Sequence, residues 1–232
     1  MKANTEQITK KHTKRNVFTF VLLFTLILAF VLSLIQHSRS FLIMTIIISV
    51  LIFIPGIIGR LYKVDIPAPL QIYAIVFIYA TLFLGEINNF YNTFWWWDVL
   101  IHISSGLAFG IIGFIILYML HKSEKIKTSP KTVAIFSFAF ALAIGALWEI
   151  VEFSIDSIFG PISNNVLMQS GSFYWTNIHT GLADTMKDLI DDAIGALFSG
   201  IMGYLYIKRE SGIVVKPIMK ELKKDNPRFF KK

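Results

Sequence analysis

The chain has 232 residues, of which 55% are hydrophobic and only 16% are charged, and its mean hydropathy is +0.62. A composition this apolar excludes an ordinary soluble domain and predicts an all-α, polytopic membrane protein. The absence of cysteine excludes disulfides, thiolate chemistry and zinc sites with cysteine ligands. The formal net charge of +7 is concentrated at the two ends and in short loops, so it indicates orientation in a membrane and no nucleic-acid partner.

Six apolar segments follow one another along the chain, and the first runs without a charge for the roughly 20 residues that a helix needs to cross the hydrocarbon core. They cover residues 16–36, 41–58, 70–84, 99–120, 132–155 and 185–207. We interpret the first as a retained span because it shows no small-residue cleavage site. The predicted organisation is a basic tail at 1–15, a six-helix transmembrane domain at 16–207 and a second basic tail at 208–232.

Basic residues alternate between successive connections. They are frequent in both tails and in the loops after the second and fourth segments, where Arg60, Lys63 and Lys122 stand. The other connections carry almost none, including the long loop at 157–183. Cytoplasmic loops are the basic ones, so we expect both termini in the cytoplasm and the 157–183 loop outside. The basic tails are then expected to contact anionic lipids of the inner leaflet.

The last apolar segment opens with a series of carboxylates. Asp184, Asp188 and Asp192 are spaced four residues apart, so they share one face of a helix, with Asp191 at its edge. The same face continues as a run of small residues, Gly195, Ser199 and Gly203, which allows another helix to approach closely. Acids on such a face point into a helix bundle, where ionisable groups are costly and indicate a functional site.

Two other segments place ionisable groups at the same depth. Asp98 and His102 form an i, i+4 pair at the outer end of the fourth segment, and Glu149 and Glu152 lie near the outer end of the fifth. The predicted topology brings all of them to the outer leaflet. The inner halves of these three segments contain no charged residue.

Each of these residues also has a simpler explanation. Asp98 and Asp184 precede helix starts, where aspartate is a common N-cap. His102 alone is more typical of a buried histidine bonded to a carboxylate, and the tryptophans at 95–97 are typical of an interface belt. These explanations do not account for three segments that carry acids and a histidine at one depth.

The spacing Asp98-x-x-x-His102, the block Trp148-Glu149-Ile-x-Glu152 and the block Asp184-Thr-x-x-Asp188-Leu-x-x-Asp192-x-x-Gly-Ala together resemble the YjdF-like bacterial membrane proteins. These proteins are distantly similar to VanZ-like proteins. The resemblance covers roughly residues 97–203. It implies that seven residues, six acids and His102, are characteristic polar positions of the family, that Asp191 is not one of them, and that the location is a bacterial plasma membrane. It implies no activity.

From these residues we expect an outward-facing, metal-dependent hydrolase or transferase that acts on a lipid or lipid-linked envelope molecule. An imidazole with several carboxylates suits Zn²⁺ or a similar divalent cation. The expected metal ligands are His102, Glu149, Asp188 and Asp192, and the candidate catalytic residues are Asp98, Asp184 and Glu152, with Glu152 as general base. The spacing matches no established metal-binding motif.

Two alternatives of other classes remain open. The acids could form the binding site of a cation- or proton-coupled transporter, although the inner halves offer only isolated hydroxyls such as Ser137 and Ser199. They could also be structural contacts in a non-catalytic component of the envelope machinery. Tolerance of Asp188→Asn would favour this last class, because an amide keeps hydrogen bonds but is a poor metal ligand.

Overall fold

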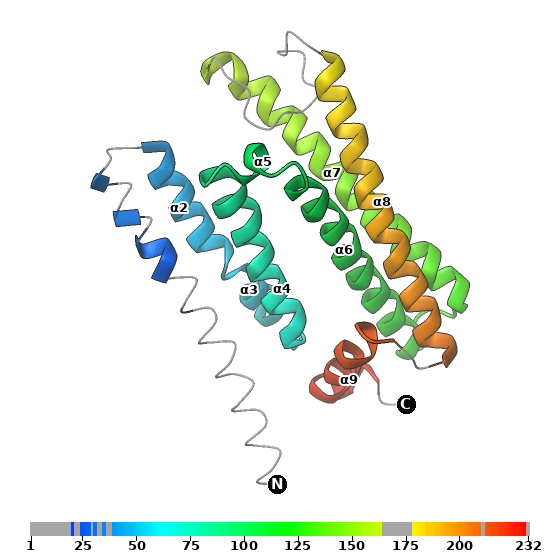
Figure 1. Cartoon of the computed structure of the whole chain (residues 1–232). Coiled ribbons are helices and arrows are strands. Elements are labelled where there is room, and N and C mark those ends of the chain that lie inside the picture. The colour runs from blue at the N-terminus through cyan, green and yellow to red at the C-terminus, as the bar shows by residue number, and fades with distance from the viewer. Residues whose placement is uncertain are drawn as a thin grey trace. The chain divides into compact units, whose positions relative to one another are not determined.

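The structure is a computed structural model, and it describes residues 20, 24–28, 30–31, 34–35, 39–163, 178–209 and 212–230. In that part of the chain every regular element is a helix (Figure 1). The predicted span at 16–36 falls mostly outside the described residues. The chain divides into two compact units, the first comprising Met1–Trp97 with Glu221–Asn226 and the second Asp98–Lys220 with Pro227–Lys232.

Between residues 39 and 97, the first unit contains five helical elements. They are α2 (Arg39–Leu51), α3 (Ile54–Leu61), α4 (Ala68–Ile78), the π-helical continuation η1 (Tyr79–Ile87) and the short α5 (Phe90–Thr93). Where one span at 41–58 is predicted, the structure has a break between α2 and α3. Pro55 stands in the first turn of α3, where its missing N–H costs nothing, but it could not donate within a continuous helix.

Apolar side chains hold the first unit together. Leu26, Ile48, Ile52 and Ile75 are buried in one cluster, and aromatic and aliphatic residues of η1 pack on it. The segment Glu221–Asn226, near the end of the sequence, also belongs to this unit. Glu221 accepts a hydrogen bond of 2.6 Å from the backbone N–H of Ala68, at the start of α4. This carboxylate therefore satisfies one of the donors that a helix N-terminus leaves free.

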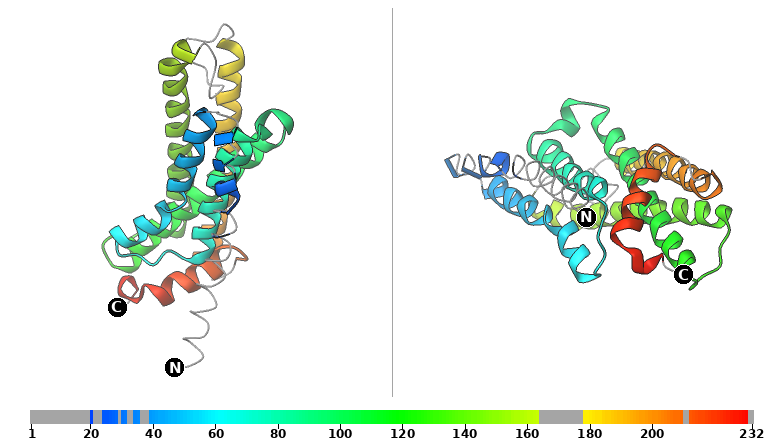
Figure 2. Two further views of the ribbon diagram at one scale, coloured as in Figure 1. Left: turned by 90° about the vertical axis from the view of Figure 1, so that its left-hand side faces the viewer. Right: turned by 90° about the horizontal axis from the view of Figure 1, so that it is seen from below.

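The second unit is built on three long helices that carry the predicted polar residues. They are α6 (Trp97–Lys122), α7 (Pro130–Ser163) and α8 (Ile178–Arg209), which lie side by side in all views (Figures 1 and 2). Together with Ala68–Ile87 of the first unit, they provide the four described helices that are long and apolar enough to cross a membrane. Both α7 and α8 extend beyond the predicted spans, because a helix can continue past the apolar stretch that defines a span.

The three helices approach closely at small residues. A Cβ on Gly195 of α8 would overlap the backbone carbonyl of Ile103 on α6, and a Cβ on Gly106 would overlap the backbone of Asp192. Further along the same helices, Gly110 lies against the hydroxyl of Ser199. The predicted small-residue face of the last span is thus confirmed as a helix-packing face.

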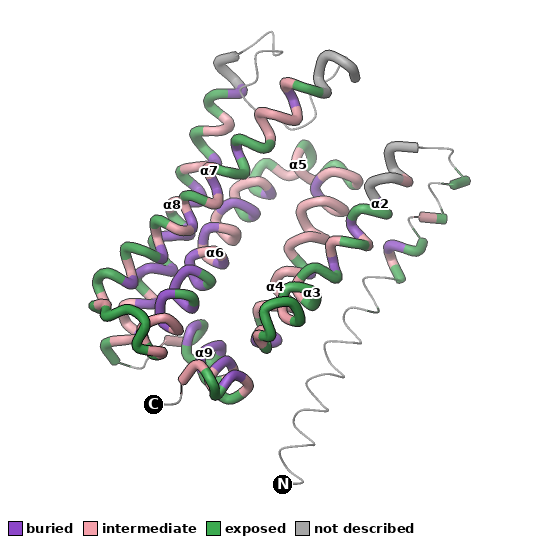
Figure 3. The backbone as a smooth tube through the Cα atoms, turned by 180° about the vertical axis from the view of Figure 1, so that it is seen from behind, coloured by how far each residue is buried: buried purple, intermediate pink, exposed green. Residues whose placement is uncertain are grey.

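Of the three helices, α6 has the largest buried share, as its purple stretches in Figure 3 show. Phe114 is fully buried, packs against Gly203 and contacts the rings of Tyr118 and Tyr206 with centroid distances of 5.5 and 5.8 Å. These aromatic rings fill the part of the unit that lies toward the C-terminal ends of α6 and α8.

The last described elements are α9 (Val215–Asp225) and the 3₁₀ turn η2 (Pro227–Phe229). Along α9, Ile218, Met219 and Leu222 are buried, while the lysines at 216, 220 and 224 are exposed. This amphipathic pattern is why a basic, otherwise polar tail forms a helix in the folded chain.

Candidate functional site

The site begins at the N-terminal end of α6. Asp98 stands in the first turn and His102 follows one turn later on the same face, as the four-residue spacing predicts. His102 is only 7% exposed as a whole residue, in a helix that is otherwise mostly apolar. A buried imidazole needs polar partners, and the structure supplies them from α6 and α8.

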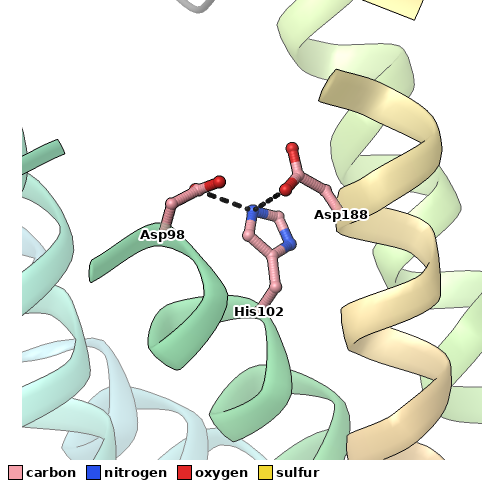
Figure 4. Close-up of side chains that lie close together, drawn as sticks. All are labelled: Asp98, His102 and Asp188. Atoms are coloured by element: carbon pink, nitrogen blue, oxygen red, sulfur yellow. Dashed lines mark ion pairs between the residues drawn. The ribbon is translucent and has the colours of Figure 1, made fainter. Parts of the chain in front are cut away.

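Two carboxylates face the same nitrogen of His102. The imidazole Nε2 lies 3.6 Å from Asp98 Oδ1 and 3.9 Å from Asp188 Oδ1, which reaches in from α8 (Figure 4). One ligand atom from each of these three residues lies within 4.8 Å of the others. This is the one group of at least three potential metal-ligating side chains found in the described part of the chain.

Asp192 occupies the opposite side of the imidazole. Its Oδ2 lies 3.5 Å from His102 Nδ1, and its Oδ1 accepts a hydrogen bond of 2.5 Å from the hydroxyl of Ser105. A Cβ on Gly145 of α7 would overlap this carboxylate. Asp192 is therefore fixed by α6 and α7 where it can hold the ring of His102, as the outer carboxylate of a carboxylate–histidine–metal arrangement does.

A lysine lies among these acids. The ammonium of Lys187 is 2.8 Å from Asp98 Oδ2, 3.5 Å from Asp188 Oδ1 and 3.9 Å from Asp191 Oδ2. Its side chain is 45% exposed, whereas the carboxylates that it contacts are more buried. The ammonium thus supplies positive charge between Asp98 and Asp188, on the side where His102 Nε2 also points.

The acids of α7 complete the cluster. Glu149 is 5% exposed, and neither of its carboxylate oxygens makes a hydrogen bond with the described residues. Its charge interacts with those of His102 and Asp192, while half-buried Glu152 interacts with Glu149 and His102. Three helices therefore converge on one imidazole, as the sequence predicts.

Asp184 has a different environment from the one that an N-cap requires. Because α8 begins at Ile178, Asp184 lies well inside the helix and cannot cap its first turn. Its charge interacts with those of Asp98, Lys187 and His102. Asp184 therefore belongs to the edge of the cluster.

The structure places all seven predicted site residues near His102. It also shows which side of the imidazole the aspartates of α6 and α8 occupy. Asp98 lies with Asp188 on the Nε2 side of His102, Asp192 lies on the Nδ1 side, and Glu149 and Glu152 of α7 interact electrostatically with the imidazole. Sequence reasoning gave no role to Lys187, Ser105 or Gly145. The position of Lys187 within the run 184–192 was a usable signal, since a single cation among four aspartates is a natural counter-charge.

The cluster contains many more acidic than basic groups. Seven carboxylates interact there with one lysine and one histidine: Asp98, Glu149, Glu152, Asp184, Asp188, Asp191 and Asp192. Within the described residues, Asp188 Oδ1 and Asp191 Oδ2 are also buried without a hydrogen bond. Buried carboxylates require cations or protons, and a nitrogen with several oxygens is a ligand set that fits Zn²⁺ or a similar divalent ion.

These features define a helical membrane protein with a histidine–carboxylate cluster among its spans. The family described as "Predicted membrane protein (DUF2238)" matches residues 18–209, most of the chain, and the chain belongs to this family. A relative from Thermotoga maritima, described as "Uncharacterized protein", is 26% identical over 145 residues. The aligned part is 62% of this chain and 66% of the relative, so the chain spans just under two thirds of that relative's length. No solved structure matches the chain.

Proposed function

We propose that this protein is a membrane-embedded, metal-dependent hydrolase or transferase that acts on a lipid or lipid-linked envelope molecule. The observation that carries the proposal is the convergence of Asp98, His102 and Asp188 on one point, with their ligand atoms within 4.8 Å of one another. These three side chains would hold a divalent cation such as Zn²⁺, because an imidazole nitrogen and carboxylate oxygens are ligands that this ion accepts.

The position of Lys187 supports a cation at this point. Its ammonium contacts the two carboxylates that would share the metal ion with His102. We infer that the ammonium holds these carboxylates in the metal-free protein and moves away when a divalent ion binds. Its partial exposure allows this movement, because a lysine side chain can carry its charge to the membrane surface.

The remaining acids are assigned roles around the metal. Asp192 orients His102 from its other nitrogen, and Glu149 is the next candidate ligand because its buried oxygens are without hydrogen bonds in the described structure. A bound divalent ion would activate a water molecule or polarise a substrate oxygen. Glu152, half-buried beside Glu149, is the proposed general base, and Asp184 lies at the edge where a substrate would enter.

The proposed setting follows from the distribution of basic residues. We propose six spans, both termini in the cytoplasm and a bacterial plasma membrane as the location, which places the cluster in the outer leaflet. The resemblance to YjdF-like proteins supports the bacterial setting, as does the Thermotoga relative. A site in one leaflet lies within reach of lipid headgroups and lipid-linked sugars or phosphates.

The packing beyond the cluster favours an enzyme over a transporter. Ser137 and Ser199 are fully buried, but each hydroxyl donates to a carbonyl of its own helix at 2.7 Å. Further along, the rings of Phe114, Tyr118 and Tyr206 pack against one another. A transporter needs polar groups on both sides of its binding site, and the described helices continue with apolar packing instead.

The first test is elemental analysis of detergent-purified protein without a histidine tag or chelators. Wild type is compared with His102→Ala and Asp188→Asn, and with Glu86→Gln as a matched control, since Glu86 is a half-buried acid of a membrane helix outside the cluster. We expect close to one divalent ion per chain in wild type and Glu86→Gln, and strong depletion in the two site variants. Absence of metal from folded wild type would overturn the metal centre.

The enzymatic part requires a second readout. Lipid extracts of a deletion strain, complemented with wild type or Asp188→Asn, are compared by mass spectrometry. We expect one lipid-linked species to accumulate in the deletion strain and in the Asp188→Asn strain but not with wild type. Full rescue by Asp188→Asn would contradict catalysis and favour a structural role for the acids.

A further inference from the structure

The first unit contains a cavity that is unrelated to the acid cluster. It has a volume of about 790 Å³ and is lined by residues of α3, the following turn and α4, together with Phe20. Its lining is mostly apolar and includes Ile52, Phe53 and Ile75. Three charged residues, Arg60, Lys63 and Asp65, also line it.

Arg60 and Lys63 have no evident structural role in the described part of the chain. Both side chains are exposed, and within the described residues neither has an ion pair or a side-chain hydrogen bond. Arg60 lies in the last turn of α3, where a cation compensates the free carbonyls of the helix end. Lys63 follows the helix in a left-handed conformation, φ 52°, so this explanation does not cover it.

The cavity has a charged end and an apolar wall. Its cations stand where α3 ends and just before the candidate span Ala68–Ile87 begins, at the level expected for lipid headgroups. Ile52 and Phe53 lie in the break between α2 and α3, and Ile75 lies in α4. Two cations and one carboxylate leave an excess of one positive charge, which complements an anionic head attached to an apolar tail.

We propose that this cavity binds an anionic phospholipid, with its phosphate at Arg60 and Lys63 and an acyl chain along Ile52, Phe53 and Ile75. Basic pockets between membrane helices recognise such headgroups by the same combination of charge and apolar surface. The predicted topology puts Arg60 and Lys63 on the cytoplasmic side, where basic residues and anionic lipids meet. This inference is independent of the proposed metal centre.

The turn beside the cavity is held in place before any ligand binds. Asn226 donates from Nδ2 to the carbonyl of Asp65 and accepts from its N–H, both at 2.8 Å. Gln71 donates to the carbonyl of Ile66 at 2.7 Å. A preformed turn reduces the ordering cost of binding, so lipid affinity is expected without a folding step.

Gly56 offers a way to fill the cavity without disturbing the helix. It lines the cavity, and a Cβ added there would meet no atom within 4 Å. Gly56→Phe therefore places a ring in the space proposed for the acyl chain. The double variant Arg60→Ala/Lys63→Ala removes the charged end instead, and Lys125→Ala/Lys127→Ala is the control for general loss of positive charge.

Native mass spectrometry of the full-length, delipidated protein measures binding of phosphatidylglycerol and phosphatidylethanolamine. We expect wild type to prefer phosphatidylglycerol, and Arg60→Ala/Lys63→Ala to bind it more weakly by about fivefold for each removed charge, so roughly 25-fold in total. Gly56→Phe should lose binding of both lipids, and Lys125→Ala/Lys127→Ala should bind like wild type. Thermal unfolding of each variant confirms that it is folded.

Three results would overturn the proposal. One is equal binding of both lipids by wild type, which would remove the headgroup selectivity. Another is wild-type affinity in folded Arg60→Ala/Lys63→Ala. The third is an equal loss in the Lys125→Ala/Lys127→Ala control, which would assign binding to the overall charge of the protein.

Discussion

Gly145 provides the sharpest test of how the cluster is organised. It lies on α7, and a Cβ added there would overlap Oδ2 of Asp192 and approach its Cγ to 2.9 Å. Alanine at this position should push the carboxylate away from His102 Nδ1 and from the hydroxyl of Ser105. The variant therefore removes the support of the imidazole without changing any proposed ligand.

The expected effect on metal binding can be estimated from outer carboxylates of this kind. Loss of such a group typically weakens metal affinity by about 10- to 100-fold, equivalent to about 1.4–2.7 kcal/mol. The effect on folding should be smaller, because the overlapping atoms are the end of a side chain. Alanine also has a higher helix propensity than glycine, by about 0.8–1 kcal/mol in a helix interior.

Two other glycines serve as references. In Gly106→Ala, the added Cβ would overlap the backbone of Asp192, and this backbone can move only if α8 moves. We therefore expect the unfolding free energy to fall by about 1–3 kcal/mol. Gly56→Ala meets no atom within 4 Å and should leave metal affinity unchanged. Competition with a fluorescent chelator gives the affinity, and denaturant titration in mixed micelles gives the stability.

The variants of Gly145 and Gly106 should show opposite profiles. Gly145→Ala should lose affinity while remaining stable, and Gly106→Ala should lose stability. Wild-type affinity in a folded Gly145→Ala protein would show that Asp192 does not hold the imidazole. If metal affinity and unfolding free energy fell together in both variants, the effect would be due to helix packing alone.

Lys187→Gln should raise affinity for a divalent ion by less than about tenfold, since it removes a competing but 45% exposed ammonium, and unchanged or weaker chelator competition would contradict this. A divalent ion at about 100 times its dissociation constant should stabilise wild type by about 2.7 kcal/mol, seen as a higher midpoint of thermal unfolding that a chelator reverses, whereas His102→Ala should not respond. Phe114→Ala should lower the unfolding free energy by about 3–5 kcal/mol because the ring is fully buried, with unchanged metal affinity in the folded fraction; a change below about 1 kcal/mol would mean that the ring is not part of the packed core. Asn226→Ala should cost about 1–3 kcal/mol in the same titration because it leaves the N–H and carbonyl of Asp65 without these partners, and no loss would mean that water replaces them.

Several features of the site follow from sequence because they are local to one helix. Asp98 and His102 share a face through their four-residue spacing, and the structure places them 3.6 Å apart. The small residues at 195, 199 and 203 predict a close helix contact, which is present at Ile103, Gly110 and Phe114. Apolar length alone predicts the four long helices.

Other features depend on how the helices meet. The register of α8 against α6 determines which side of the imidazole each carboxylate of α8 occupies. This register cannot be predicted from the residue spacing within a single segment. Lys187 enters the cluster because its long side chain reaches across to α6, where it meets Asp98. The start of α8 at Ile178 decides that Asp184 is an interior residue, since an apolar window marks a span and not the first turn of a helix.

The sequence by itself determined an all-helical membrane protein with acids and a histidine on the faces of three helices, because hydropathy and helical periodicity act over a few turns. Only the tertiary structure decided which of these side chains meet. Contacts between helices depend on the register and crossing points of the helices and on side-chain conformations. These contacts bring together residues that are far apart in the sequence, such as His102 and Asp192, which are 90 positions apart.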